Sequence, residues 1–365
     1  MKKLRVAVIF GGKSGEHEVS IASAAAIFKN LDPSRYDAVP IKIEKDGRWL
    51  LTGDVPTSIS AAAVHREATG REVAPRGVTA LQPVDPTTTL TSGSIDVVFP
   101  VLHGPYGEDG TVQGLLELAN VPYVGAGVLG SAAGMDKAVM KTLFRARDLP
   151  VSPYLVVLRS EWARDAAGIT SRVERELHYP VFVKPANLGS SVGISKAKDA
   201  AAFAEAMGLA LQYDRKIVIE AAVPKAREIE CAVLGNDDPQ VSIPGEVIPL
   251  REFYDYEAKY LDANGARAEI PARLTPEQTA DVRRLAIEAF KACDLSGLAR
   301  VDFLVNGDTG ETFVNEVNTL PGFTEISQYP KLWEASGVSY PALLNRLIEL
   351  AIERHTEKQQ LRTSL

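Results

Sequence analysis

The sequence predicts an α/β fold, with α+β character in its C-terminal part. Short apolar runs of strand length alternate with helical patterns along most of the chain. The chain has 365 residues, which is too long for one ordinary core and indicates two or three domains. Its composition, 45% hydrophobic and 24% charged, is typical of a globular protein.

The first third of the chain alternates strands with helices. Strands are expected at residues 4–10, 38–43 and 95–102, and helices at residues 16–31 and 111–119. This order predicts a doubly wound parallel sheet with helices on its faces. Residues 52–94 are rich in Ala, Thr, Pro and Ser, and their pattern predicts no particular element.

The rest of the chain divides into two further blocks. The middle block is expected to contain helices at residues 132–147, 161–177 and 199–211, and strands at residues 154–158, 180–185 and 217–220. The last block is expected to contain strands at residues 228–234, 240–248, 298–305 and 312–317, and helices at residues 276–293 and 341–354. We therefore expect three domains, at residues 1–128, 129–222 and 223–365.

Charge and composition limit the classes of partner. The net charge of -7 argues against a nucleic-acid partner, although a few lysines in a cleft can still hold a polyphosphate. No apolar run approaches the roughly 18 residues that a membrane span needs. The N-terminal apolar run stops at Gly11, which favours a buried strand over a signal peptide. Cys231 and Cys293 lie in unrelated contexts, so no disulfide framework is expected and a cytoplasmic location is favoured.

Two adjacent strands near the C-terminus carry the strongest chemical signal. The period of a strand places Arg300 and Asp302 on one face of the first, and Glu316 and Asn318 on one face of the second. The turn between them, at residues 307–310, is typical of a hairpin. Three oxygen ligands side by side suit magnesium, and the arginine could contact a phosphoryl group. The pattern alone leaves open a plain hairpin with a solvated polar face.

A strand ending in Lys184 leads into a loop that contains Gly189, Ser190, Ser191 and Gly193. Glycines let the backbone approach a phosphate closely, while hydroxyls and amides donate to it. The order of residues differs from that of a Walker P-loop, and an ordinary surface loop is the alternative. The Pro-Gly turn and the helix start in residues 319–327 offer a second site for an anion.

The first and third of the expected strands are followed by further polar residues. The spacing of Gly11, Gly12 and Gly15 differs from that of a dinucleotide-binding turn. Glu16, at the start of the following helix, either interacts with the helix dipole or binds a substrate ammonium. His103 stands at the end of an apolar strand, where ligands of α/β sheets gather, and a structural role is equally open.

Residues 253–260 (FYDYEAKY) form a charged, aromatic run without apolar periodicity, which predicts a mobile lid that excludes water. Together with the other motifs, this run resembles the ATP-grasp superfamily and, within it, the D-alanine–D-alanine ligase family. The similar runs are residues 8–20 (VIFGGKSGEHEVS), 103–110 (HGPYGEDG), 184–193 (KPANLGSSVG), 253–260, 300–302 (RVD) and 316–322 (EVNTLPG). They occur in the family's order and span nearly the whole chain.

The resemblance implies a three-domain ATP-grasp architecture and a set of binding residues. Two magnesium ions, which manganese could replace, would be bound by Asp302, Glu316 and Asn318. ATP would be bound by Lys137, Lys184, Ser190, Ser191, Glu220, Glu228 and Asn315. The two D-alanines would be bound by Glu16, His103, Arg300, Gly322 and Ser327. The catalytic set would be Glu16, His103, Ser190, Lys259, Tyr260, Arg300 and Gly322.

The resemblance also implies the reaction, in which two D-alanines are joined through an acyl phosphate for peptidoglycan precursor synthesis. Relatives that make D-alanyl-D-lactate lack a tyrosine at the position of Tyr260, so its presence implies a dipeptide product. Ligation of D-alanine to D-serine or D-lactate stays open as an alternative, and so does a nicotinamide-dependent oxidoreductase. A cytoplasmic homodimer without nucleic-acid or membrane partners is expected.

Overall fold

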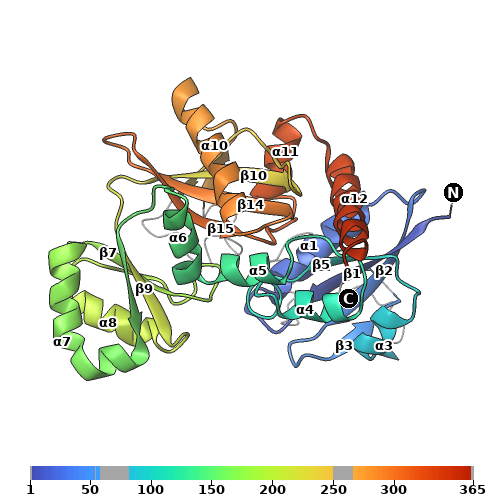
Figure 1. Cartoon of the computed structure of the whole chain (residues 1–365), viewed down its shortest axis with the longest axis horizontal. Helices are drawn as coiled ribbons and strands as arrows, with labels where there is room; N and C mark the ends of the chain where they lie inside the picture. Colours follow the sequence, from blue (N-terminus) through green and yellow to red (C-terminus); the bar gives the residue numbers. More distant parts are fainter. Residues whose placement is uncertain (1, 54, 58–81, 250–265, 363–365) are drawn as a thin grey trace.

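The computed structural model describes residues 2–53, 55–57, 82–249 and 266–362, which form three β-sheets with helices packed around them (Figure 1). The first sheet has the strand order β4-β3-β2-β1-β5. Its strands are β1 (Leu4–Gly11), β2 (Tyr36–Ile43), β3 (Trp49–Leu51), β4 (Gln82–Pro83) and β5 (Val97–Val101). The helices that accompany them are α1 (His17–Asn30), α3 (Pro86–Thr91) and α4 (Thr111–Leu118).

The first sheet is mixed rather than wholly parallel. Strands β1, β2 and β5 are parallel, as predicted, but β3 and β4 run antiparallel to their neighbours. The expectation failed here because a short turn follows β2, and a short turn can only reverse the chain, whereas a parallel neighbour needs a long crossover. Helices still cover both faces: Val8 packs with Ile27 of α1, while Ile9 packs with Leu116 of α4.

The second sheet is antiparallel, in the order β6-β9-β7-β8. Its strands are β6 (Tyr154–Leu158), β7 (Val181–Pro185), β8 (Ser195–Ala197) and β9 (Lys216–Ala221). Helices α7 (Arg159–Glu176) and α8 (Ala200–Ala210) cover one face, where Val183 and Ile219 join their core. Side chains alternate along a strand, so Lys184 and Glu220 belong to the opposite face.

The long helix expected at residues 132–147 is two helices, α5 (Val128–Met135) and α6 (Lys137–Ala146). Asp136 separates them with an extended backbone (φ -84°, ψ 102°), and its carboxylate accepts hydrogen bonds from the amides of Ala138 and Val139. An aspartate that caps a new helix in this way interrupts a pattern that otherwise looks continuous. The break determines which way α6 faces, and α6 carries two lysines of the site described below.

The third sheet has the order β13-β12-β10-β14-β15, with β11 paired to β10. Its strands are β10 (Arg227–Gly235), β11 (Gln240–Val241), β12 (Gly245–Pro249), β13 (Ala266–Glu269), β14 (Gly297–Val305) and β15 (Thr312–Asn318), all antiparallel to their neighbours. Helices α10 (Pro276–Ala292), α11 (Gln328–Ala335) and α12 (Tyr340–Gln359) complete this part. The single strand expected at residues 240–248 is broken before Gly245, because Pro244 cannot donate to a strand ladder.

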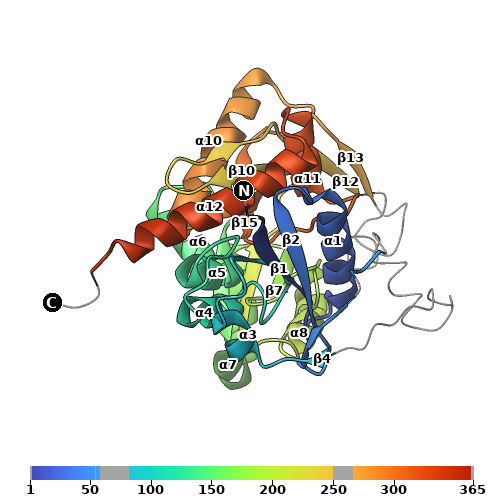
Figure 2. The same ribbon diagram turned by 90° about the vertical axis from the view of Figure 1, so that its right-hand side faces the viewer.

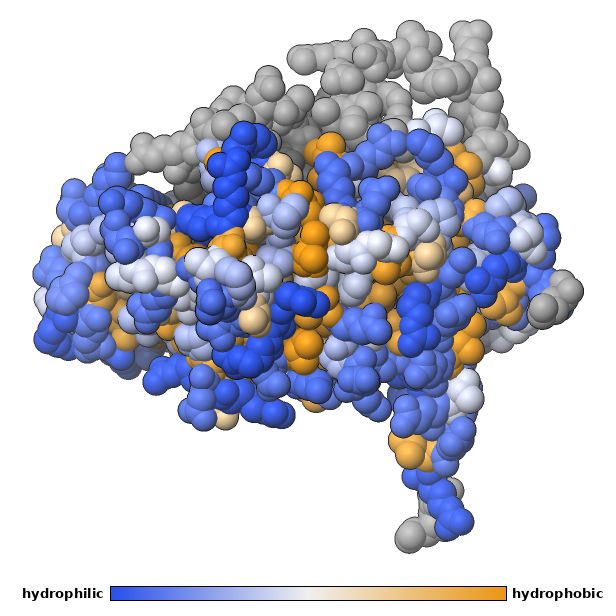
Figure 3. All heavy atoms as spheres, turned by 90° about the horizontal axis from the view of Figure 1, so that it is seen from above, coloured by the Kyte–Doolittle hydropathy of each residue, from blue (hydrophilic) through white to orange (hydrophobic). Residues whose placement is uncertain are grey.

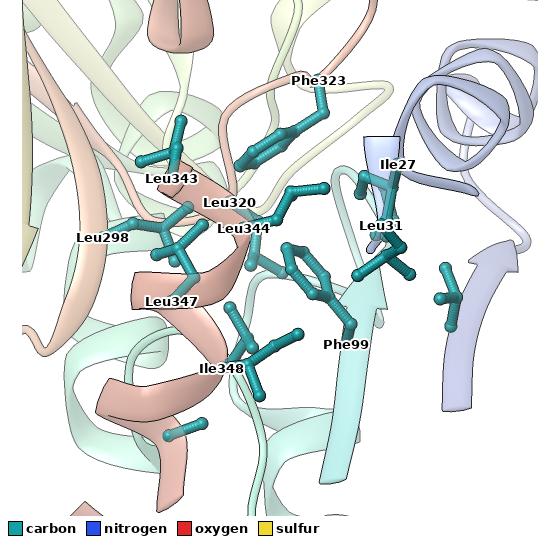
Figure 4. Close-up of a cluster of buried hydrophobic side chains, with 14 of the residues drawn as sticks. Ile27, Leu31, Phe99, Leu298, Leu320, Phe323, Leu343, Leu344, Leu347 and Ile348 are labelled. Atoms are coloured by element: carbon teal, nitrogen blue, oxygen red, sulfur yellow. The ribbon is translucent and has the colours of Figure 1, made fainter. Parts of the chain in front are cut away.

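Helix α12 packs against the first sheet as well as the third, and Figure 2 shows it running between them. One buried cluster contains Phe99 of β5, Leu298 of β14 and Leu347 of α12 (Figure 4). No described helix is both long and apolar enough to cross a membrane. The face of the molecule in Figure 3 is largely hydrophilic, with small apolar areas between the polar ones.

Arg354 of α12 is expected to stabilise the contact between this helix and the segment at residues 123–125. Its guanidinium donates to the carbonyls of Tyr123 (3.2 Å) and Gly125 and to the hydroxyl of Ser296 (2.6 Å), and it lies 4.5 Å from the centre of the Tyr123 ring. We expect Arg354→Met to lower the free energy of unfolding by about 2–4 kcal/mol, because two carbonyls lose their donor.

Urea denaturation followed by circular dichroism would measure this loss. Arg346→Met is the control, because Arg346 lies on the same helix but, among the described residues, forms ion pairs only with the exposed Glu349 and Glu353. The control should change stability by less than about 0.5 kcal/mol. Equal urea midpoints for the two variants would contradict the structural role of Arg354.

Candidate active site

The hairpin of β14 and β15 places the predicted carboxylates next to each other. Asp302 is directly opposite Glu316 in the ladder, and Arg300 is opposite Asn318. The Asp302 side chain is 13% exposed and that of Glu316 is 34% exposed. This face of the hairpin is therefore largely covered, which argues against the plain solvated hairpin.

Arg300 lies between carboxylates of two neighbouring strands. Its Nε and Nη2 atoms donate to the two oxygens of Asp302 at 2.7 and 2.6 Å, and Nε is 3.3 Å from Oε1 of Glu230. Glu230 on β10 is directly opposite Asp302, so a row of three carboxylates crosses the sheet at Glu230, Asp302 and Glu316. Glu230 was not predicted from the sequence, although strand alternation from Glu228 would have placed it on this face.

The donor atoms of this row fit a hard divalent cation. Asp302 and Glu316 offer carboxylate oxygens, and Asn318 offers an amide oxygen that accepts from the Leu320 amide at 3.2 Å. Within the described part of the chain, no group of three or more His, Cys, Asp or Glu side chains is arranged to hold a metal by itself. Magnesium needs only one or two protein carboxylates and completes its octahedron with water and phosphate, so this smaller set suits it.

Two lysines connect the hairpin to the Gly/Ser loop. The ammonium of Lys137 donates to the carbonyl of Leu188 at 2.6 Å and lies 3.8 Å from Oε2 of Glu316. The ammonium of Lys184 donates to Glu220 at 2.9 Å and to Asn315 Oδ1 at 3.4 Å. Residues of α6, β7, β9 and β15 therefore meet in one region, where two ammonium groups lie close to the Gly/Ser loop.

A third lysine, Lys141, was not predicted. It is only 1% exposed, and its Nζ lies 3.2 Å from Oε1 of Glu220, whose other oxygen accepts from Lys184. Burial opposes ionisation of Glu220, yet the two neighbouring ammonium groups lower its pKa to about 2. Burial also disfavours the charged form of Lys141, and therefore lowers the pKa of this lysine. The spacing of four residues from Lys137 places both lysines on one face of a helix, which is the signal that could have revealed it.

The Gly/Ser loop reaches from the second sheet to the first. Ser190 and Ser191 have left-handed backbones (φ 52° and 60°), which are costly outside glycine. The loop is held in place at Asn187, whose backbone amide donates to Asp214 at 2.9 Å. The hydroxyl of Ser190 donates to Oε1 of Glu16.

Glu16 is 9% exposed and occupies the N-cap position of α1. Among the described contacts, its side chain makes no hydrogen bond to the first amides of that helix; it turns toward the Gly/Ser loop instead. A Cβ atom on Gly104 would lie 2.9 Å from its Oε2, so two loops enclose the carboxylate closely. This orientation favours a role in binding over simple compensation of the helix dipole.

His103 is buried between the first sheet and the segment after β15. Its Nδ1 donates to the carbonyl of Leu320 at 2.9 Å and lies 3.7 Å from Oε1 of Glu108. Burial opposes a charged imidazolium, but the carboxylates of Glu108 and Glu16 raise the pKa of His103 overall. A histidine with these partners both orders the segment and faces the carboxylate of Glu16.

The same segment contains Gly322 and Ser327. A Cβ on Gly322 would lie 2.8 Å from the Ser327 hydroxyl, which accepts from the Thr324 amide at 2.9 Å. The next amide, that of Phe323, donates to Ser23 of α1 at 3.1 Å. Gly322 and Ser327 therefore lie near the first helix, on the side of the site where Glu16 and His103 are found.

Two of the sequence-predicted residues lie outside the described residues: Lys259 and Tyr260, together with the rest of the predicted lid. Glu228 lies on β10, and its carboxylate contributes, less than those of Glu220 and Glu316, to raising the pKa of Lys184. Ser191 lies in the loop beside Ser190. All other residues of the predicted sets belong to the connected region described above.

Comparison with known proteins agrees with this geometry. The family descriptions "D-ala D-ala ligase N-terminus" and "D-ala D-ala ligase C-terminus" match residues 5–126 and 143–349. The curated D-alanine–D-alanine ligase of Heliobacterium modesticaldum is 50% identical, over 99% of this chain and 98% of its own length. That of Geobacillus thermodenitrificans is 49% identical, over 98% of each chain.

Two solved structures extend the comparison. The D-alanine–D-alanine ligase from Coxiella burnetii superposes with a TM-score of 0.81 at 39% identity, covering 99% of this chain and 97% of its own. The VanG D-Ala:D-Ser ligase from Enterococcus faecalis has a TM-score of 0.81 at 33% identity, covering 96% and 100%. These relatives do not favour a nicotinamide-dependent oxidoreductase. The chain belongs to the D-alanine–D-alanine ligase family.

Proposed function

We propose that this chain joins two D-alanine molecules into D-alanyl-D-alanine at the expense of ATP, a step in peptidoglycan precursor synthesis. One observation carries the proposal beyond family membership. The hydrogen bond from Ser190 to Glu16 connects a buried carboxylate, suited to a substrate ammonium, with the loop that Lys137 holds at Leu188. An amino-acid site and a phosphate site are therefore contiguous, which is the arrangement that transfer of a phosphoryl group to an amino acid requires.

The residues divide into three groups within a three-domain ATP-grasp architecture, with domains at residues 1–128, 129–222 and 223–365. The nucleotide group consists of Lys137, Lys184, Ser190, Ser191, Glu220, Glu228 and Asn315. The amino-acid group consists of Glu16, His103, Arg300, Gly322 and Ser327, with Tyr260 and Lys259 from the lid. Asp302, Glu316 and Asn318 would hold two magnesium ions, which manganese can replace and which supply neutralising charge at the phosphates.

The first step joins a carboxylate oxygen of one D-alanine to the γ-phosphorus of ATP and breaks the bond to ADP. The second step joins the amine of the other D-alanine to the acyl carbon, and inorganic phosphate leaves. Lys137 and Lys184 compensate negative charge on the phosphates, while Glu16 holds the first ammonium. Arg300 and the Gly322 amide donate to the tetrahedral oxyanion, so the protein contributes mainly by positioning and charge.

The second substrate in this proposal is also D-alanine. The protein is proposed to act as a homodimer in the cytoplasm. Tyr260 supports a dipeptide over a D-lactate ester, and the similarity to a D-Ala:D-Ser ligase makes D-serine the second candidate. The difference between these substrates is one hydroxyl, which an apolar pocket rejects only modestly.

Product analysis tests the proposal directly. We expect phosphate release with ATP, magnesium and D-alanine, and a product with the mass of D-alanyl-D-alanine even when D-serine or D-lactate is present at equal concentration. A predominant D-alanyl-D-serine product would favour the second candidate. Nucleotide binding without phosphate release in the presence of D-alanine would contradict a ligase.

A further inference from the structure

Lys141 is a buried cation that none of the roles above uses. Its side chain is 1% exposed and lies 5.9 Å from the centre of the Tyr154 ring. Among the described residues, its ammonium has no hydrogen bond of good geometry, and its nearest charge is Glu220 Oε1 at 3.2 Å. Burial of an ammonium costs free energy, so a lysine in such surroundings requires an explanation for why its charge is kept.

The cluster of Lys141, Glu220 and Lys184 contains two ammonium groups and one carboxylate. Glu220 is 1% exposed and offers one oxygen to each lysine. Without Lys141, the carboxylate would be paired with Lys184 alone and the pair would be neutral. With Lys141, the cluster keeps one net positive charge, and Lys184 carries that charge at the end of β7, next to the Gly/Ser loop.

Stability does not explain Lys141. Ala138, Ala186 and Val218 form a small buried apolar cluster, and the Tyr154 ring that lies near Lys141 packs against it. Replacing one buried charge by an apolar side chain of similar length would leave Lys184 and Glu220 paired, so no charge would lose its last partner. Packing and ion pairing would both tolerate a methionine at this position.

We propose that Lys141 is a positioning residue for nucleotide binding: it engages one oxygen of Glu220, so that Lys184 retains its positive charge for the phosphates. This inference rests on the proposed function, because it takes the ligand at Lys184 to be a polyphosphate. Lys141 acts only through Glu220 and is not a group that touches the nucleotide.

Binding of ATP and of adenosine, each measured by titration calorimetry on the full chain, isolates the phosphate contribution. Lys141→Met should weaken ATP binding about tenfold, since it removes one unit of charge near the phosphates. Adenosine binding should stay within about twofold, because adenosine has no charge to compensate. The KM for ATP should rise while the KM for D-alanine does not, and the melting temperature without ligand should not fall.

Two further variants sharpen the test. The double variant with Lys141→Met and Glu220→Gln contains Lys184 as the only charge of the cluster, so the ratio of adenosine to ATP dissociation constants should return toward that of the wild type. Arg145→Met is the matched control, because Arg145 lies one turn further along α6, 5.8 Å from the centre of the same Tyr154 ring, but is exposed. It should leave the ratio unchanged.

Three results would overturn the inference: unchanged ATP affinity in Lys141→Met, equal loss of ATP and adenosine binding, or a lower melting temperature that the double variant does not restore. Each of these results would mean that Lys141 has only a structural role. Failure of the proposed function is separate from these, because it would appear as wild-type protein that forms no dipeptide from ATP and D-alanine.

Discussion

Replacing Glu316 by alanine is expected to lower kcat for dipeptide formation by about 10³-fold. Glu316 lies beside Asp302 in the hairpin and 3.8 Å from the ammonium of Lys137. Its carboxylate is therefore placed to hold a divalent cation at the same location where a lysine meets the Gly/Ser loop. Loss of that carboxylate would remove a cation ligand from the place where charge develops during phosphoryl transfer.

The fold should survive this change, since Glu316 is 34% exposed and the ammonium of Lys137 beside it still donates to the carbonyl of Leu188. Coupled phosphate-release assays would measure kcat. Metal binding without turnover would be measured from the ATP-induced rise in melting temperature, as the magnesium concentration that gives half of this rise. We expect that concentration to rise at least tenfold, in line with the loss of one charged ligand.

Glu311→Ala is the control for this variant, because Glu311 is exposed and lies just before β15, outside the ladder that pairs Asp302 with Glu316. It should retain wild-type kcat and magnesium dependence. A Glu316→Ala enzyme with wild-type turnover, or with an unaltered magnesium requirement, would remove Glu316 from the proposed metal set.

The hairpin was accessible from the sequence because strand alternation is a local rule. Once Arg300 and Asp302 are assigned to one strand and Glu316 and Asn318 to the next, the period of two fixes which side chains share a face. The observed register places Asp302 opposite Glu316. Neighbours further away, such as Glu230 on β10, depend on a third strand that is distant in the sequence.

The lysine cluster was only partly accessible for the same reason. Lys184 was predicted because the loop that follows it has a recognisable composition. Lys141 could be assigned to the site only from the packing of α6 against the second sheet, which brings it close to Glu220. The expected helix at residues 132–147 would not have oriented this face correctly, because the cap at Asp136 starts a new helix. Such breaks depend on a single side chain rather than on periodicity.

Short strands also escape pattern recognition. Strands β8 and β13 have three and four residues, which is too few to display alternation. The contact between Glu16 and Ser190 joins residues 174 positions apart, and the resemblance to a known family only placed both residues in one catalytic set. Local patterns therefore predicted the elements and one ligand row, whereas the junction of the two halves of the site required tertiary structure.

The contact between Glu16 and Ser190 is the basis of a second prediction with a large expected effect. We expect Glu16→Gln to raise the KM for the first D-alanine about 10²-fold while ATP affinity stays within about twofold. Glu16 is buried and enclosed by two loops, so a substrate ammonium would lose its counter-charge in a site that water cannot easily reach. Glutamine has the same shape and still accepts the Ser190 hydrogen bond, which leaves the Gly/Ser loop and the nucleotide side intact.

The folded state should not lose stability in Glu16→Gln. The buried carboxyl of Glu108 has a raised pKa, caused first by burial and also by the negative charge of Glu16, so the two carboxylates repel each other. Neutralising Glu16 relieves that repulsion and also removes its attraction for His103, so the two changes offset each other. Thermal unfolding without ligand should therefore give a melting temperature close to that of the wild type, and a raised KM for D-alanine could not be attributed to a damaged fold.

Glu18→Gln provides the matched comparison, because it makes the same chemical change at a buried position of the same helix. Glu18 faces Lys45, with which it pairs at 2.7 Å, rather than the Gly/Ser loop. Initial rates at saturating ATP over a range of D-alanine concentrations should give a wild-type KM for Glu18→Gln. If Glu16→Gln shows the same KM as this control, or if its ATP affinity falls together with its D-alanine affinity, Glu16 is not the residue that holds the ammonium, and the contact with Ser190 only orders the loop.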